Sequence, residues 1–155
     1  MSELNIPLIR KLQARLLDES RREAFNMADW ITHNPYPLGT TDPAENERVH
    51  ACGTSACIAG HVVLMLPEYH VLDDQTQKRI IVRNRRGTEV VVMWAAQRAL
   101  GLTLKQTDQL FLMLQDPTLK GEIVPASTVT AAQAVAALDN MIAHGEPKWG
   151  DVIRA

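Results

Sequence analysis

The chain has 155 residues, which corresponds to one domain at about 150 residues per domain. Hydrophobic residues make up 46% and charged residues 22%, a globular balance that excludes a disordered tail, a collagen-like chain and a coiled-coil rod. Sixteen basic and eighteen acidic residues give a formal net charge of −2, so only a local basic patch could bind a phosphate backbone.

A helix is predicted near the N-terminus, where Asn5 fits the N-cap and Pro7 the first turn. Its apolar stripe consists of Leu8, Leu12 and Leu16, with Ile9 and Leu17 beside it. The charged residues expected to face solvent are Arg10, Lys11, Arg15, Asp18 and Glu19. Charges interrupt the apolar positions and no small-residue cleavage site follows, so this segment does not have the pattern of a signal peptide.

The next region combines a short aromatic element with a long loop. FNMADW, at residues 25–30, predicts a short helical turn whose three large apolar side chains need burial. Residues 34–51 contain three prolines and a glycine and predict a loop, and loops of this length are usually functional or mobile. Tyr36 is the best candidate there for an exposed aromatic residue that anchors a partner.

SACIAGHVVLML, at residues 55–66, predicts the central buried helix because it is apolar almost all round. Thr54 or Ser55 can cap this helix, and Pro67 ends it. The apolar stretch is too short to span a bilayer, so a cytoplasmic protein is predicted. In that compartment Cys52 and Cys57 are expected to be thiols.

A hairpin is predicted from two short strands, residues 79–84 and 89–92, joined by residues 85–88. The alternative is a helix that is capped at Thr88 and runs through the valines to Leu100. In either case residues 94–100 are expected to be helical, with Gly101 ending the helix.

Two capping boxes predict the last two long helices. Thr130 with Gln133 begins a helix through Ala143, and Thr103 with Gln106 begins a helix through Leu114. The residues that this second helix is expected to bury are Leu104, Leu110, Phe111 and Leu114. Burial is expected for the aromatic residues Phe25, Trp30, Trp94, Phe111 and Trp149, with Trp149 the first exception because it is near the C-terminus. The expected fold is mainly α: a compact bundle of about five helices with one small β-hairpin, forming a single domain over residues 1–155.

Three blocks carry a family resemblance: FNMADW at 25–30, CGTSACIAG at 52–60 and AAQRALGLTLKQTDQLF at 95–111. Together they resemble a small uncharacterised family of bacterial and phage proteins with an F-x-M-x-x-W element, a CGTxxCIAG motif and a helix-LGLT-helix. The residues that match the second motif are Cys52, Gly53, Thr54, Cys57, Ala59 and Gly60. No activity is assigned to that family, so the resemblance implies a site without implying a reaction.

The cysteine motif suggests three kinds of site. A zinc site would use His50, Cys52, Cys57 and His61, although this spacing is not a standard zinc-finger spacing. A nucleophilic Cys52 at a helix N-terminus would need His70 as its base, with Asp73 or Asp74 orienting that histidine. A disulfide between the two cysteines requires Cys52 to lie outside the helix. Buried thiols and a hydrogen-bonded core histidine are the structural alternative.

Basic residues of the predicted hairpin are candidates for phosphate contacts. They are Lys78, Arg79, Arg83, Arg85 and Arg86. Strand alternation predicts one face formed by Arg79, Ile81, Arg83 and Arg85. The alternative is a solvated hairpin whose charges protect the sheet edge.

Gly101 between two predicted helices also gives the outline of a helix-turn-helix. Thr107 occupies the position of the expected buried aliphatic residue, and Lys105 is the one cation of the second helix, so a plain helical corner is favoured over DNA reading.

These patterns predict an intracellular, non-catalytic binding or interaction module without a cofactor. The chain carries no phosphate loop, cofactor fingerprint or set of His, Asp and Glu at catalytic spacing, so an enzyme is less favoured. The alternatives are a cysteine-centred enzyme or zinc protein that uses CGTSAC, and nucleic-acid binding through the basic hairpin. Another protein is the partner considered first, nucleic acid is second, and no membrane partner is expected.

Overall fold

The computed structural model describes residues 3–18, 24–25, 31–32, 55–74 and 79–155. The helices in these ranges are α1 (Ile6–Leu17), α3 (Ile58–Met65), α4 (Val92–Leu100), α5 (Leu104–Leu112), α6 (Ala131–His144) and α7 (Trp149–Arg154), with short 3-10 helices η1 (Pro117–Leu119) and η2 (Ala126–Thr128). The strands are β1 (Ala24–Phe25), β2 (Ile31–Thr32), β3 (Ser55–Ala56), β4 (His70–Asp74) and β5 (Arg79–Arg83). The protein is therefore mainly α with a small β-hairpin, as predicted. Across the described ranges, every helix is too short or too polar to cross a membrane.

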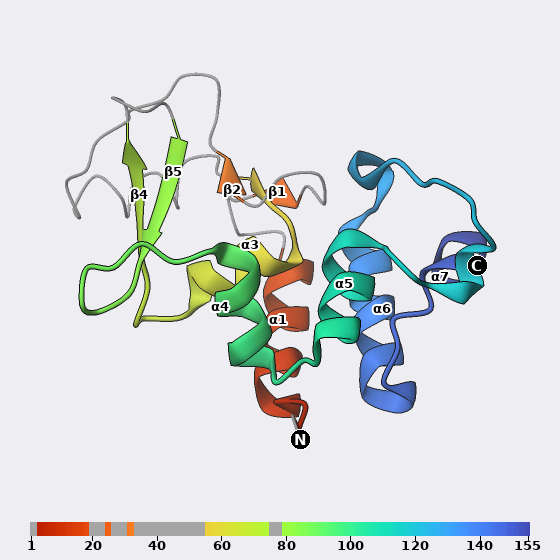
Figure 1. The fold of residues 1–155 in the computed structure, drawn as a ribbon. Coiled ribbons are helices and arrows are strands. Elements are labelled where there is room, and N and C mark those ends of the chain that lie inside the picture. The colour runs from red at the N-terminus through yellow and green to blue at the C-terminus, as the bar shows by residue number, and fades with distance from the viewer. Residues whose placement is uncertain (1–2, 19–23, 26–30, 33–54, 75–78) are drawn as a thin grey trace.

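Helix α1 lies in the middle of the helical layer, where it packs against α6, α3 and α4 (Figure 1). Buried apolar side chains from all six α-helices named above form the main core. A second, smaller cluster consists of Val63, Val71, Val82 and Ala95. This second cluster attaches the β4–β5 hairpin to α3 and α4. Figure 1 shows the hairpin at one end of the molecule and α7 with the C-terminus at the other.

The start of α1 is fixed as the sequence predicts. Oδ1 of Asn5 accepts a hydrogen bond from the Leu8 backbone N–H at 3.2 Å, which is an N-cap contact. The Asn5 backbone N–H donates to the Leu100 carbonyl at 2.8 Å. Gly101 has φ +73°, and a Cβ there would lie 1.8 Å from the carbonyl oxygen of Glu3. Glycine is therefore required at this position, where the N-terminus meets the end of α4.

One charged residue of α1 does not face solvent. Arg15 is buried, and its Nε–H donates to Nδ1 of His61 on α3 at 3.1 Å. The expectation that Arg15 lies on the solvent side is therefore wrong. Helical periodicity could not show this contact, because a long side chain on the flank of a helix can reach a neighbouring element.

Helix α3 is the buried helix predicted from the apolar run, and residues 58–63 are all buried. Its N-cap is Cys57, whose Sγ accepts a hydrogen bond from the Gly60 backbone N–H at 3.5 Å. The predicted caps, Thr54 and Ser55, are wrong because the helix begins later. Cys57 caps α3 by the same geometry that a serine would use.

Residues before α3 form strands instead of helix. Ser55–Ala56 is the central strand of a three-stranded sheet, parallel to β1 and antiparallel to β2. Phe25 belongs to β1, so the helical turn predicted there is wrong at this residue. The remainder of that predicted turn, residues 26–30, lies outside the described residues.

The predicted strand at residue 79 is confirmed as β5, but its expected partner is wrong. All five residues of β5 pair antiparallel with β4. The expected partner, residues 89–92, contributes only a bridge between Arg83 and Glu89. Helix α4 begins at Val92, so the alternative helix capped at Thr88 is wrong as well. Strand β4 escaped prediction because its two aspartates are rare in strands.

Both predicted capping boxes, at Thr103 and Thr130, are confirmed. Helix α5 nevertheless ends at Leu112, and both Leu104 and Leu114, which were expected in the core, are exposed.

The burial of two tryptophans is the opposite of the prediction, in which Trp94 was buried and Trp149 was the first exception. Trp149 is 0% exposed, whereas Trp94 is 48% exposed. The indole Nε1–H of Trp149 donates to the Gln109 carbonyl at 2.8 Å, so its one polar group is satisfied within the core.

Candidate anion-binding site

A pocket of about 420 Å³ lies beside the β4–β5 hairpin and α4. Figure 1 shows these elements at the same end of the molecule. Three parts of the chain form it: the connection from α3 to β4, the turn after β5, and α4. The lining residues are Glu68, Tyr69, Asn84, Arg85, Arg86 and Arg98. The apolar cluster beneath the hairpin holds these three parts together, so the pocket is built on packed elements.

Asn84 fixes the backbone of the turn that carries two of the arginines. Its Oδ1 accepts hydrogen bonds from the backbone N–H groups of Arg86 and Thr88, both at 3.0 Å. Its backbone carbonyl accepts from the Gly87 N–H at 2.9 Å, and Gly87 has φ +79°. A side chain that binds its own backbone two residues on is typical of an Asx turn. The turn therefore presents Arg85 and Arg86 from a constrained backbone.

The pocket concentrates positive charge. Its lining includes the guanidinium groups of Arg85, Arg86 and Arg98 and one carboxylate, that of Glu68. Within the described ranges, none of these four side chains forms an ion pair or a hydrogen bond. A guanidinium group offers several N–H donors in a plane, which suits the oxygen atoms of a phosphate or carboxylate. The arrangement can therefore bind an anion without first breaking a salt bridge.

Sequence reasoning identified part of this site. Arg85 and Arg86 line the pocket, and Arg83 is exposed at the end of β5. The predicted open face is wrong, because Ile81 is buried between the predicted basic positions. Arg79 lies at the other end of β5, where the structure describes its backbone but not its side chain.

Arg98 and Tyr69 were missed. The local signal for Arg98 is the W-x-x-x-R spacing on α4, which places Arg98 on the same helix face as Trp94. Tyr69 follows the turn after α3 and has no comparable local signal, because it reaches the pocket through tertiary packing.

The cysteine-centred candidates divide between described and undescribed parts of the chain. His50, Cys52 and Tyr36 lie outside the described residues, so their proposed roles stay predictions. Nδ1 of His61 accepts a hydrogen bond from a cation, the Arg15 guanidinium, which does not fit a metal-ligand role for that nitrogen. His70 is exposed on β4. Among the residues with described placement, no three His, Cys, Asp or Glu side chains gather closely enough to hold a metal ion.

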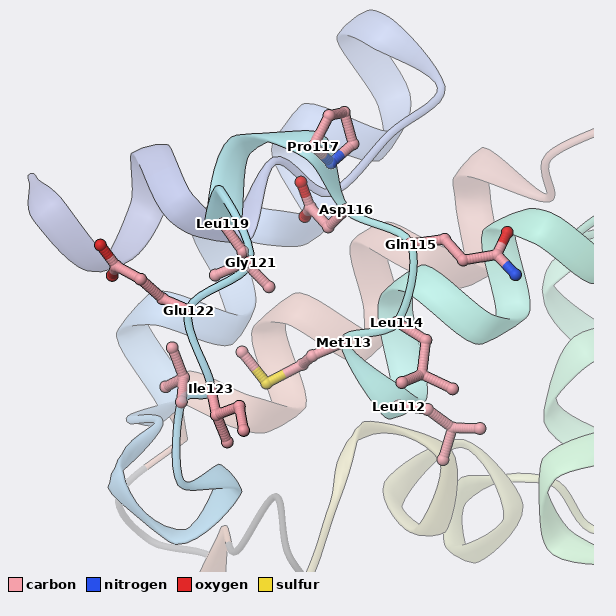
Figure 2. A pocket seen from close by; sticks show the side chains of 11 residues that line it. Leu112, Met113, Leu114, Gln115, Asp116, Pro117, Leu119, Gly121, Glu122 and Ile123 are labelled. Atoms are coloured by element: carbon pink, nitrogen blue, oxygen red, sulfur yellow. The ribbon is translucent and has the colours of Figure 1, made fainter.

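A second pocket, of about 530 Å³, lies at the opposite end of the molecule, where the chain leaves α5 and passes through η1. Figure 2 shows Leu112 and Leu114 on one side of it, Ile123 on the other and Met113 between them. Most of this lining is apolar.

The loop around the second pocket has an unusual backbone. Three non-glycine residues, Met113, Gln115 and Lys120, have φ values of +56°, +57° and +53°. Such conformations cost about 1–2 kcal/mol each and persist only where surrounding contacts hold them.

Within this loop, the Asp116 side chain is hydrogen-bonded to two other parts of the chain. One carboxylate oxygen accepts hydrogen bonds from the backbone N–H and the hydroxyl of Thr118, at 2.9 and 2.6 Å. The other accepts from the Trp149 backbone N–H at 2.8 Å. Gly150 donates to the Thr118 hydroxyl at 2.9 Å, so η1 and α7 are joined at several points. The Asp116 carboxylate and the Thr118 hydroxyl are therefore both engaged within the fold.

Comparison of the chain with protein-family models, curated proteins and solved structures gives no match. The family suggested by the sequence blocks therefore stays a prediction, and the functional argument depends on the described residues themselves.

Proposed function

We propose that this protein is a non-catalytic binding module that takes an anionic ligand into the pocket of Arg85, Arg86 and Arg98. The observation that carries this proposal is the convergence of three arginines, from a constrained turn and from α4, without an ion pair among the described residues. Its cytoplasmic location and its kinship with bacterial and phage proteins of the CGTxxC motif are part of the same proposal.

Charge and exposure support binding over catalysis at this pocket. Its lining contains three permanent cations, an amide, a phenol and one carboxylate. Among these described lining residues there is no pairing of a nucleophile with an adjacent base, which covalent catalysis requires.

Titration calorimetry with inorganic tripolyphosphate tests this function. Arg86→Gln removes one charge-assisted hydrogen-bond donor, and such a contact contributes about 1.5–3 kcal/mol, so we expect affinity to fall at least tenfold. Lys120→Gln is the matched control, because it removes one exposed cation at the end of η1, which packs against α7 and not against the arginine pocket. The control should change affinity less than twofold.

Salt provides the second readout. Affinity should fall as salt rises, since anion binding releases counterions. An affinity that does not change with salt, or an equal loss in Arg86→Gln and Lys120→Gln, would show that this pocket does not bind the anion.

A further inference from the structure

We propose that the ligand is single-stranded nucleic acid, with its phosphates in the arginine pocket and a base stacked on Trp94. This inference rests on the proposed anion-binding function and names its ligand class.

The first observation is the exposure of Trp94. Its side chain is 48% exposed. The described apolar residues that pack against the two core clusters do not include Trp94. Val91, three residues earlier, is also exposed, so the two form a small apolar surface at the start of α4. An exposed indole offers a large flat face on which a nucleic-acid base can stack.

The second observation is the position of Trp94 relative to the pocket. Trp94 and Arg98 are four residues apart on α4 and therefore lie on one helix face, about 6 Å apart along the axis. Helical side chains lean toward the N-terminus of their helix. The side chain of Arg98 consequently extends toward the turn that carries Trp94, which places a stacking surface beside the cationic pocket.

This combination of an aromatic face and neighbouring arginines suits single strands better than duplexes. Proteins that bind single strands pair a basic groove with aromatic side chains, and each stacked base contributes about 1–3 kcal/mol. In a duplex the bases are already stacked on one another and their faces are not accessible. The three arginines also limit the electrostatic contact to about three phosphates, consistent with a net charge of −2 for the whole chain.

The test uses fluorescence anisotropy with a labelled twelve-nucleotide oligothymidylate and an abasic strand of the same length and charge. Trp94→Ala should weaken binding of oligothymidylate about tenfold or more, and Trp94→Phe should recover most of the loss because it restores a stacking face. Leu104→Ala is the matched control, since it removes an exposed apolar side chain from α5. The abasic strand should bind the unaltered protein about tenfold more weakly, and Trp94→Ala should bind both strands equally.

Salt gives an independent number. Neutralising three phosphates of a single strand predicts a slope of about −2 in a plot of log affinity against log salt. Arg86→Gln should reduce that slope by about 0.7, whereas Trp94→Ala should leave it unchanged.

The outcomes separate the two proposals. Equal binding of the thymidylate and abasic strands, or tighter binding of the corresponding duplex, would overturn the stacking inference while anion binding stands. Tripolyphosphate binding without binding of either strand would also overturn it and would point to a small phosphate ligand. Failure to bind tripolyphosphate and both strands would refute the proposed function itself.

Discussion

At the α4 end of the molecule, three arginines line a pocket without an ion pair among the described residues, whereas at the α7 end both oxygens of Asp116 are hydrogen-bonded. The two hollows are similar in size, at about 420 and 530 Å³. They differ in whether their polar side chains are hydrogen-bonded within the fold. Substitution of the hydrogen-bonded Asp116 should reduce stability, whereas substitution of the arginines should reduce ligand binding.

The largest effect on stability is expected from Asp116→Ala. Loss of the carboxylate leaves two backbone N–H groups without acceptors, that of Trp149, which is buried, and that of Thr118, which is partly buried. An unsatisfied buried donor costs about 1–3 kcal/mol. We expect the free energy of unfolding to fall by about 3 kcal/mol, and Tm by roughly 10 °C for a domain of this size. Urea and thermal unfolding measure both quantities.

Arg85→Gln with Arg86→Gln is the corresponding change in the other pocket. Because these exposed side chains form no hydrogen bond or ion pair with a described residue, the free energy of unfolding should change by less than about 0.5 kcal/mol. If Asp116→Ala proved as mild as the arginine pair, the proposed distinction between the two pockets would be lost.

A smaller but still large effect is expected from Gly150→Ala. A Cβ at this position would lie 1.9 Å from the Thr118 carbonyl oxygen, so the α7 and η1 backbones would have to separate. Overpacking of this kind costs about 1–3 kcal/mol. The near-ultraviolet circular dichroism of the adjacent Trp149 should change along with the unfolding midpoint.

Gly121→Ala separates crowding from backbone conformation. Nothing lies within 4 Å of a Cβ built at Gly121, but its φ is +77°, so only the conformational cost of about 1–2 kcal/mol applies. Gly121→Ala should therefore lower the unfolding midpoint without changing the near-ultraviolet spectrum. For Gly150→Ala, in contrast, an unchanged near-ultraviolet spectrum would contradict the close contact between η1 and α7.

Local rules predicted much of this fold and nonlocal contacts explain the errors. Asn5, Thr103 and Thr130 cap the helices for which they were proposed, because a cap depends on residues within one turn. Pairing of β5 with β4, in contrast, depends on which segment tertiary packing brings beside the strand. Hydrophobicity could not rank Trp94 and Trp149, since the Asp116 and Gln109 contacts that bury Trp149 come from distant parts of the chain.

In the candidate site, too, the local feature was predicted and the nonlocal one was not. The basic turn was predicted at residues 85–88, which include Gly87, a typical turn residue, whereas Asn84 was assigned to the strand before it. Arg98 joins it only in the folded chain, across α4, and no local pattern places it beside Arg86. The sequence therefore predicted two of the six described lining residues, Arg85 and Arg86, and did not predict the contribution of α4.

The smallest effect is expected from Asp139→Asn. This variant tests an exposed hydrogen-bonded carboxylate against the buried one of Asp116. Asp139 accepts hydrogen bonds from Arg10 at 2.7 Å and Gln13 at 2.9 Å, joining α6 to α1. Its side chain is 55% exposed, whereas Asp116 is 8% exposed overall. Solvent screens such a pair, so the free energy of unfolding at pH 7 should fall by only about 0.5 kcal/mol.

The pH dependence of that difference identifies its origin. The hydrogen bond from Gln13 is the largest cause that lowers the pKa of Asp139 below its ordinary value of 3.8; burial opposes it, and Arg10 lowers the pKa further. A lowered pKa in the folded state means that the stabilisation is complete above the ordinary value and disappears as pH falls through the folded-state pKa. Urea unfolding at pH 7 and pH 3 should therefore show a smaller difference between Asp139→Asn and the unaltered protein at pH 3. A difference that grows at pH 3, or that equals the Asp116→Ala loss at pH 7, would contradict this account. It would mean that solvent exposure does not determine how much each carboxylate contributes to the free energy of unfolding.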